Sequence, residues 1–94
     1  MDLGIAGKWA LVCGASKGLG LGCAQALVRE GVNVLIAARG ADVLQTAAAN
    51  LIADSARPAG AEVLFVAADI TTEAGRTAVF AVRRDFDIVV TNAG

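Results

Sequence analysis

The sequence has no histidine and only two cysteines, Cys13 and Cys23. Zinc sites are built mainly from thiolates and imidazoles, so two thiols without an imidazole do not supply a set of ligands. We therefore expect no metal site. Both cysteines are interpreted as small buried apolar residues, without a redox or disulfide role.

Charged residues are also scarce: they make up 18% of the 94 residues, whereas 56% are hydrophobic and the mean hydropathy is +0.64. A domain of this size has a large surface relative to its volume and is normally more polar. The excess of apolar residues favours one of two classes. These are a membrane protein, or a portion of a larger protein whose strands are buried on both faces.

No apolar run reaches the roughly 18 residues that a membrane-spanning helix needs. Every candidate run is interrupted by a charged residue, namely Lys8, Lys17, Arg29, Glu30, Arg39, Asp42 or Asp54. Residues 1–4 lack the basic and apolar regions of a secretory signal. The sequence therefore predicts a cytoplasmic protein with no membrane partner.

The net charge is −1, and the largest basic cluster is the pair Arg83 and Arg84. A nucleic-acid-binding surface or a polybasic membrane patch needs a denser cluster of positive charge. We therefore expect no nucleic-acid partner.

Four short apolar runs are typical of strands in a buried parallel sheet. The predicted strands are residues 9–13, 32–38, 63–67 and 88–91. Three helical patterns lie between them. Their apolar faces are predicted from residues at helical spacing, which are Leu19, Cys23, Ala26 and Leu27 in the first helix, and Leu44, Ala47, Ala48, Leu51 and Ile52 in the second.

The first helix is expected to stop at Gly31 and the second near Asp54. The third helix is predicted from about Glu73 to Arg84, with Thr71 or Thr72 as its N-cap. Strands that alternate with helices predict an α/β fold with a parallel sheet and right-handed crossovers.

A complete doubly wound dinucleotide-binding fold has the strand order 3-2-1-4-5-6. The predicted βαβαβαβ order supplies its first half and the fourth strand, which would remain as an open apolar edge. We therefore expect residues 1–94 to be the N-terminal part of one Rossmann-type domain, truncated after the fourth strand.

A glycine-rich stretch, Cys13-Gly14-Ala15-Ser16-Lys17-Gly18-Leu19-Gly20, joins the first strand to the first helix. Glycines there permit a tight turn, a close approach of the backbone to a pyrophosphate and close packing of helix on strand. The helix N-terminus attracts the anion. The predicted nucleotide-binding residues of this stretch are Gly14, Ser16, Lys17, Gly18, Leu19 and Gly20. The alternative is that these glycines only build a turn.

Two further motifs follow in order: Asp69-Ile70 after the third strand, and Thr91-Asn92-Ala93-Gly94 at the end of the fourth. With the glycine stretch, they make the sequence resemble the short-chain dehydrogenases/reductases over its whole length. The family's forms are T-G-x-x-x-G-x-G, an acidic–aliphatic pair, and N-N-A-G. Cys13 therefore replaces a threonine, and Thr91 replaces an asparagine.

The resemblance implies that Asp69 accepts a hydrogen bond from the adenine amino group, with Ile70 beside the ring. It places Asn92, Ala93 and Gly94 near the ribose. The alternatives are that Asp69 caps the third helix and that the last motif is a plain turn.

Cofactor preference is set at the end of the second strand, where an acid selects NAD. The sequence there is Ala37-Ala38-Arg39-Gly40, so a guanidinium stands where that acid would be. Arg39 can bind a 2′-phosphate bidentately, and Lys17 adds a second positive charge. We therefore predict NADP(H) as the cofactor.

The resemblance further implies hydride transfer between the nicotinamide and a small carbonyl or alcohol substrate, by a protein that is a dimer or tetramer when intact. The substrate would be a 3-oxoacyl thioester, a ketone or a secondary alcohol.

The family's catalytic Ser and Tyr-x-x-x-Lys lie downstream, and this chain has no tyrosine. We therefore predict no catalytic residue within it. A non-catalytic NADP-binding regulatory protein is the first alternative, and an S-adenosylmethionine-dependent methyltransferase the second.

Overall fold

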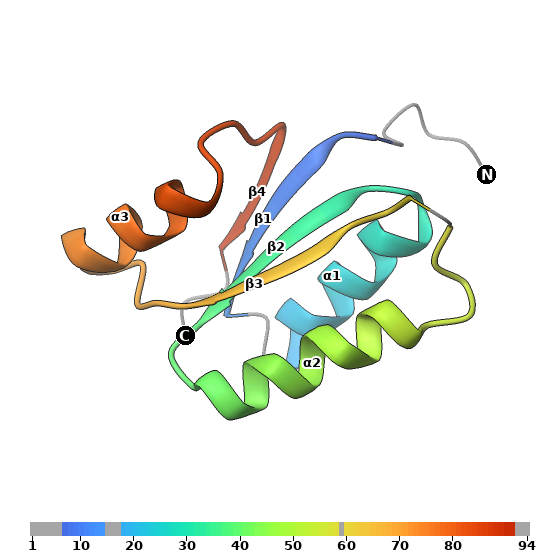
Figure 1. Cartoon of the computed structure of the whole chain (residues 1–94), viewed down its shortest axis with the longest axis horizontal. Helices are drawn as coiled ribbons and strands as arrows, with labels where there is room; N and C mark the ends of the chain where they lie inside the picture. The colour runs from blue at the N-terminus through green and yellow to red at the C-terminus, as the bar shows by residue number, and fades with distance from the viewer. Residues whose placement is uncertain (1–6, 15–17, 59, 92–94) are drawn as a thin grey trace.

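A computed structural model describes residues 7–14, 18–58 and 60–91. Four parallel strands form one sheet in the order β3-β2-β1-β4 (Figure 1). The elements in chain order are β1 (Trp9–Cys13), α1 (Gly18–Arg29), β2 (Asn33–Ala38), α2 (Ala41–Ala53), β3 (Val63–Ala67), α3 (Glu73–Val82) and β4 (Ile88–Thr91). This is the front portion of a doubly wound fold, as the sequence predicts.

The helices lie on both sides of the sheet, with α1 and α2 on one face and α3 on the other (Figure 1). Successive strand residues point to opposite faces, so in β1 Ala10 and Val12 pack towards α1 and α2, while Leu11 and Cys13 pack towards α3. The predicted burial of strands on both faces is therefore confirmed for the central strands β1 and β2.

The two outer strands keep apolar side chains in solvent. Leu64 and Phe65 of β3 are 36% and 46% exposed, and Val89 of β4 is 59% exposed. By register Leu64 and Val89 lie on the side of the sheet that carries α3, which is only partly packed, whereas Phe65 lies on the side of α1 and α2. Among the described residues β4 forms one edge of the sheet, as predicted for the fourth strand.

The predicted apolar face of α1 is partly wrong. Ala24 and Val28 are buried in the core, whereas Cys23 and Ala26 are exposed. Apolar and small residues surround almost the whole helix, so their spacing does not single out one face. Cys13 is buried as predicted, and burial raises the pKa of its thiol.

The second and third helices follow their predicted patterns more closely. Four residues of α2 are buried as expected, namely Leu44, Ala47, Ala48 and Leu51, but Ile52 is 48% exposed. The N-cap of α3 is Thr72, whose hydroxyl accepts a 2.9 Å hydrogen bond from the N–H of Gly75. Within the described part of the chain, no helix has the length and apolar character needed to cross a membrane.

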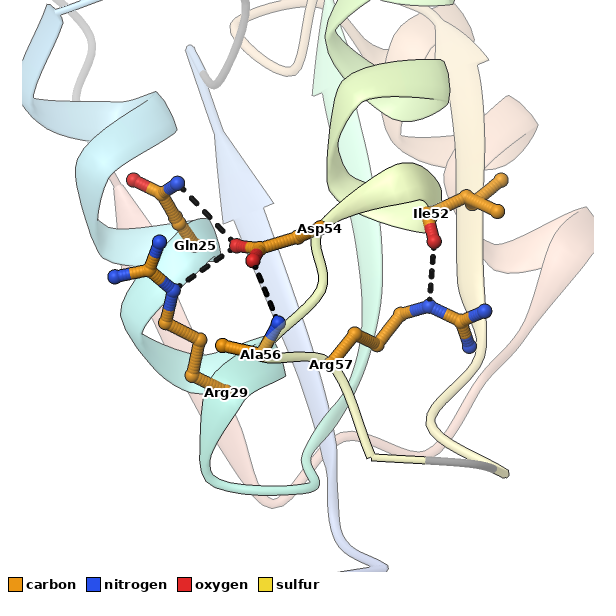
Figure 2. A network of polar contacts seen from close by, with 6 residues as sticks. All are labelled: Gln25, Arg29, Ile52, Asp54, Ala56 and Arg57. Carbon is orange, nitrogen blue, oxygen red and sulfur yellow. Dashed lines mark hydrogen bonds and ion pairs between the residues drawn. The ribbon is translucent and has the colours of Figure 1, made fainter.

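A polar clasp joins the C-terminal ends of α1 and α2 (Figure 2). Asp54 accepts hydrogen bonds from Arg29 Nε at 2.9 Å, from Gln25 Nε2 at 3.3 Å and from the N–H of Ala56 at 2.9 Å. These contacts lower the pKa of Asp54, chiefly through the Ala56 N–H and then through Arg29. The clasp fixes the spacing of the two helices at the edge of the sheet opposite the carboxyl ends of the strands.

Candidate functional site

The predicted site residues follow the carboxyl ends of parallel strands, and the strand register brings those ends together. Cys13 of β1 pairs with both Ala37 of β2 and Thr91 of β4, and Ala38 pairs with Ala67 of β3. Gly14, Arg39 and Asp69 come within two residues of these ends. In open α/β sheets, ligands bind in the crevice outside the carboxyl ends of the strands.

Gly14 makes the turn that leaves β1. Its φ is +71°, in the left-handed region that glycine adopts without steric cost. Its N–H donates a 2.8 Å hydrogen bond to the carbonyl of Ala37, which holds the turn against β2. Helix α1 begins at Gly18, and Gly20 is buried in its first turn. The glycines thus provide the tight turn and helix N-terminus that an anion site needs.

Several predicted site residues lie outside the described residues. In the glycine-rich stretch these are Ser16 and Lys17, and the side chain of Leu19 is likewise not described. At the end of β4 they are Asn92, Ala93 and Gly94. Their assigned contacts stay predictions.

Arg39 is exposed directly after β2. The N–H of Ala68 donates a 2.8 Å hydrogen bond to the carbonyl of Ala38, so the two chain segments that carry Arg39 and Asp69 are joined beyond the last strand pair. The charge of Arg39 reaches Asp69 and contributes to the lowering of its pKa. The first acid after β2 in the sequence is Asp42, an exposed residue in the first turn of α2.

Asp69 is held by its neighbour Thr71. Its Oδ1 accepts a 2.6 Å hydrogen bond from the Thr71 hydroxyl and a 3.0 Å bond from the Thr71 N–H. Those two bonds, with a smaller contribution from Arg39, hold the pKa of Asp69 below its usual value. Its Oδ2 accepts no hydrogen bond from the described residues. Asp69 therefore presents an ionised acceptor at the carboxyl edge.

The alternative that Asp69 caps α3 is wrong, because Thr72 occupies the N-cap position. Ile70 is half-buried and packs against the core cluster on the α3 face of the sheet. Its carbonyl accepts a 3.0 Å hydrogen bond from Arg76. The pair Asp69 and Ile70 is thus anchored from both sides.

Sequence reasoning missed two residues of this site. The sequence predicts Thr71 only as a possible helix cap, although an aspartate side chain often bonds to the backbone two residues further on. Gly75, in the first turn of α3, lies against the main chain of Asp69 and carried no sequence signal. Among the described residues, no three His, Cys, Asp or Glu side chains gather into a metal site.

The sequence is similar to those of known proteins. Residues 8–94 match the model of the short chain dehydrogenase family. An NADP-dependent (R)-specific alcohol dehydrogenase of Lentilactobacillus kefiri is 38% identical over 93 residues, which cover 94% of this chain and 34% of that protein.

Solved structures match over the same range. The L-sorbose reductase of Gluconobacter frateurii, solved with NADPH and L-sorbose, has a TM-score of 0.90 at 40% identity. The match covers 100% of this chain and 36% of the reductase. RhlG of Pseudomonas aeruginosa, solved with NADP, has a TM-score of 0.79 at 35% identity. That match covers 99% of this chain and 36% of RhlG. This chain spans about a third of the length of these relatives.

Proposed function

This chain belongs to the short chain dehydrogenase family, and on that premise we propose that its 94 residues are the cofactor-binding part of an NADP(H)-dependent oxidoreductase. The observation that carries the choice of cofactor is Arg39, an exposed guanidinium at the carboxyl end of β2 where an NAD-selective site would have an acid. The names of relatives that depend on NADP or were solved with it support this choice.

Arg39 would bind the 2′-phosphate, and Lys17 would add a second positive charge. A guanidinium offers parallel N–H donors that match two phosphate oxygens. The first turn of α2 adds favourable dipoles, because its N-cap is Gly40, which has no side chain to bond to the free N–H groups. Asp42 lies in that turn and reduces the positive potential.

The rest of the dinucleotide fits the same edge of the sheet. The left-handed turn at Gly14 and the N-terminus of α1 suit a pyrophosphate. Oδ2 of Asp69 suits the adenine amino group, because an ionised carboxylate only accepts hydrogen bonds. When bound, the cofactor supplies or takes the hydride. The residues of this chain bind and orient the cofactor.

The proposed reaction is the interconversion of a small carbonyl compound and its secondary alcohol. Two relatives support this choice by their names: one is an alcohol dehydrogenase, and the other is an L-sorbose reductase. We assign no residue of this chain to proton transfer at the substrate oxygen, since it has neither tyrosine nor histidine. A homo-oligomeric assembly of the intact protein is part of the proposal.

The test is equilibrium binding of NADPH and NADH to the purified protein at its natural length, followed by nicotinamide fluorescence. We expect NADPH to bind at least about tenfold more tightly, since a hydrogen bond to a charged group is worth about 1.5–3 kcal/mol. Equal or reversed affinities would contradict the cofactor assignment. Tight NADPH binding without turnover of any ketone or secondary alcohol would instead support the regulatory alternative.

A further inference from the structure

Gly75 in the first turn of α3 lies directly against the main chain of Asp69. A Cβ atom built on Gly75 would overlap the carbonyl oxygen and carbon of Asp69 and lie 3.0 Å from its nitrogen. Gly75 is buried, and its φ is not in the left-handed region. Glycine is therefore needed for space and not for backbone conformation.

Hydrogen bonds fix this close approach. The carbonyl of Asp69 accepts a 2.8 Å bond from the Thr72 hydroxyl and a 3.1 Å bond from the Thr72 N–H. The same hydroxyl accepts a 2.9 Å bond from the N–H of Gly75. Thr72 thus links the carbonyl of Asp69 to the first turn of the helix, and a side chain on Gly75 would separate them.

Asp69 is held by contacts to its main chain and by contacts to its side chain. While Gly75 and Thr72 hold the carbonyl of Asp69, Thr71 holds Oδ1 of its carboxylate. The remaining oxygen is then fixed at the edge of the sheet, within reach of the charge of Arg39. A shift of the Asp69 main chain by a few tenths of an ångström would move this acceptor as well.

We propose that Gly75 is a positioning residue for nucleotide binding: its missing side chain lets α3 seat against Asp69 and so places the Asp69 carboxylate for the adenine ring. This inference rests on the proposed function. It predicts that a methyl group at Gly75 weakens adenine binding although Gly75 itself touches no part of the nucleotide.

The chain offers a matched control in Gly22. It lies inside α1 as Gly75 lies inside α3, but nothing comes within 4 Å of a Cβ built on it. Gly75→Ala and Gly22→Ala therefore make the same chemical change at helical glycines, and only the first one collides with the main chain of the site.

The experiment measures Kd for 2′,5′-ADP by calorimetry, and the melting temperature, in the protein at its natural length. We expect Gly75→Ala to weaken 2′,5′-ADP about tenfold or more, the scale of one hydrogen bond to a charged group, and Gly22→Ala to leave the Kd unchanged. A folded Gly75→Ala protein with the wild-type Kd overturns the inference. A lowered melting temperature with an unchanged Kd does so too, because that is the signature of a merely structural role.

A second pair of variants keeps the test valid if Gly75→Ala does not fold. Thr72→Val removes the hydroxyl link between α3 and Asp69, and Thr72→Ser keeps it. We expect weaker 2′,5′-ADP binding in the first variant and wild-type binding in the second; equal Kd values in both overturn the inference.

If the wild-type protein itself does not bind 2′,5′-ADP, the proposed function fails and this inference falls with it. If the wild type binds and all variants bind equally, only this inference fails.

Discussion

The hydroxyl of Thr71 donates a 2.6 Å hydrogen bond to Oδ1 of Asp69, and this bond is the largest cause of the lowered pKa of that carboxyl. The Thr71 N–H adds a second bond of 3.0 Å. Asp69 is therefore oriented by a residue only two positions ahead, independently of any ligand. The site is in this respect preorganised, because one carboxylate oxygen is already engaged before a nucleotide arrives.

Replacing Thr71 by valine should raise the pKa of Asp69 towards its ordinary value, because the hydroxyl donor is lost while the N–H donor remains. Carbon-13 NMR titration of the Asp69 carboxyl measures this directly. Thr71→Ser keeps the donor and should keep the low pKa. An unchanged pKa in Thr71→Val would show that the hydroxyl bond does not control this group.

The same pair of variants has a consequence for acid stability. A carboxyl whose pKa is lower in the folded state stabilises the fold above its unfolded pKa, and that stabilisation is lost as the pH falls through the folded value. The wild-type protein should therefore lose more stability than Thr71→Val when the pH falls from 5 to about 2. Thermal denaturation across that range provides the measurement.

The clasp at Asp54 should make a second acid-sensitive contribution, at the opposite edge of the sheet (Figure 2). Because the pKa of Asp54 is lowered by Ala56 and Arg29, its stabilising effect is present above the unfolded pKa and lost at lower pH. Asp54→Asn should lower the melting temperature at pH 7, and the difference from wild type should disappear near pH 2.

Asp85→Asn is the control for this clasp, since the Asp85 side chain bonds to none of the described residues and only its carbonyl accepts a bond, from Arg83. It should leave the melting temperature nearly unchanged at both pH values. An equal loss in both variants would mean that charge alone, and not the clasp, is responsible.

The turn at Gly14 gives a prediction of stability and of binding. At a φ of +71° the Cβ of an alanine is strained against its own backbone, so Gly14→Ala should lower the free energy of unfolding by about 1–2 kcal/mol. It should also weaken NADPH binding. Gly22→Ala lies inside α1 with open space around it and should instead stabilise the protein by about 0.5–1 kcal/mol. Chemical denaturation compares the two, and equal effects would contradict the assigned turn.

The order of elements could be predicted from sequence because each strand is a continuous apolar run closed by glycine or polar residues. The bounds of β1, β3 and β4 agree with the predicted ranges, and β2 begins at Asn33, one residue later than predicted. A parallel sheet buries its central strands on both faces, and this produces a strong local signal. The open edge at β4 follows from the same reasoning.

The helix faces and the supports of the site were harder to predict. In α1, small and apolar residues lie all around the helix, so periodicity placed Cys23 in the core although it is exposed. Gly75 was overlooked because its role depends on a contact between α3 and Asp69 that only the folded chain creates. Local patterns reveal which residues carry charge or flexibility, but not which main-chain atoms they will meet.

The most direct test of the account replaces the two cations assigned to the 2′-phosphate, in the variant Lys17→Ala, Arg39→Asp. The measurement is the ratio of kcat/KM with NADPH to that with NADH in the protein at its natural length. Arg84→Asp makes the same change of charge as Arg39→Asp at an exposed position that is not a predicted site residue, and serves as the control. We predict a preference for NADPH in the wild type and the control, and a preference for NADH in the double variant, because an acid after β2 repels a 2′-phosphate and accepts a hydrogen bond from the 2′-hydroxyl. An unchanged ratio in the double variant would contradict the account.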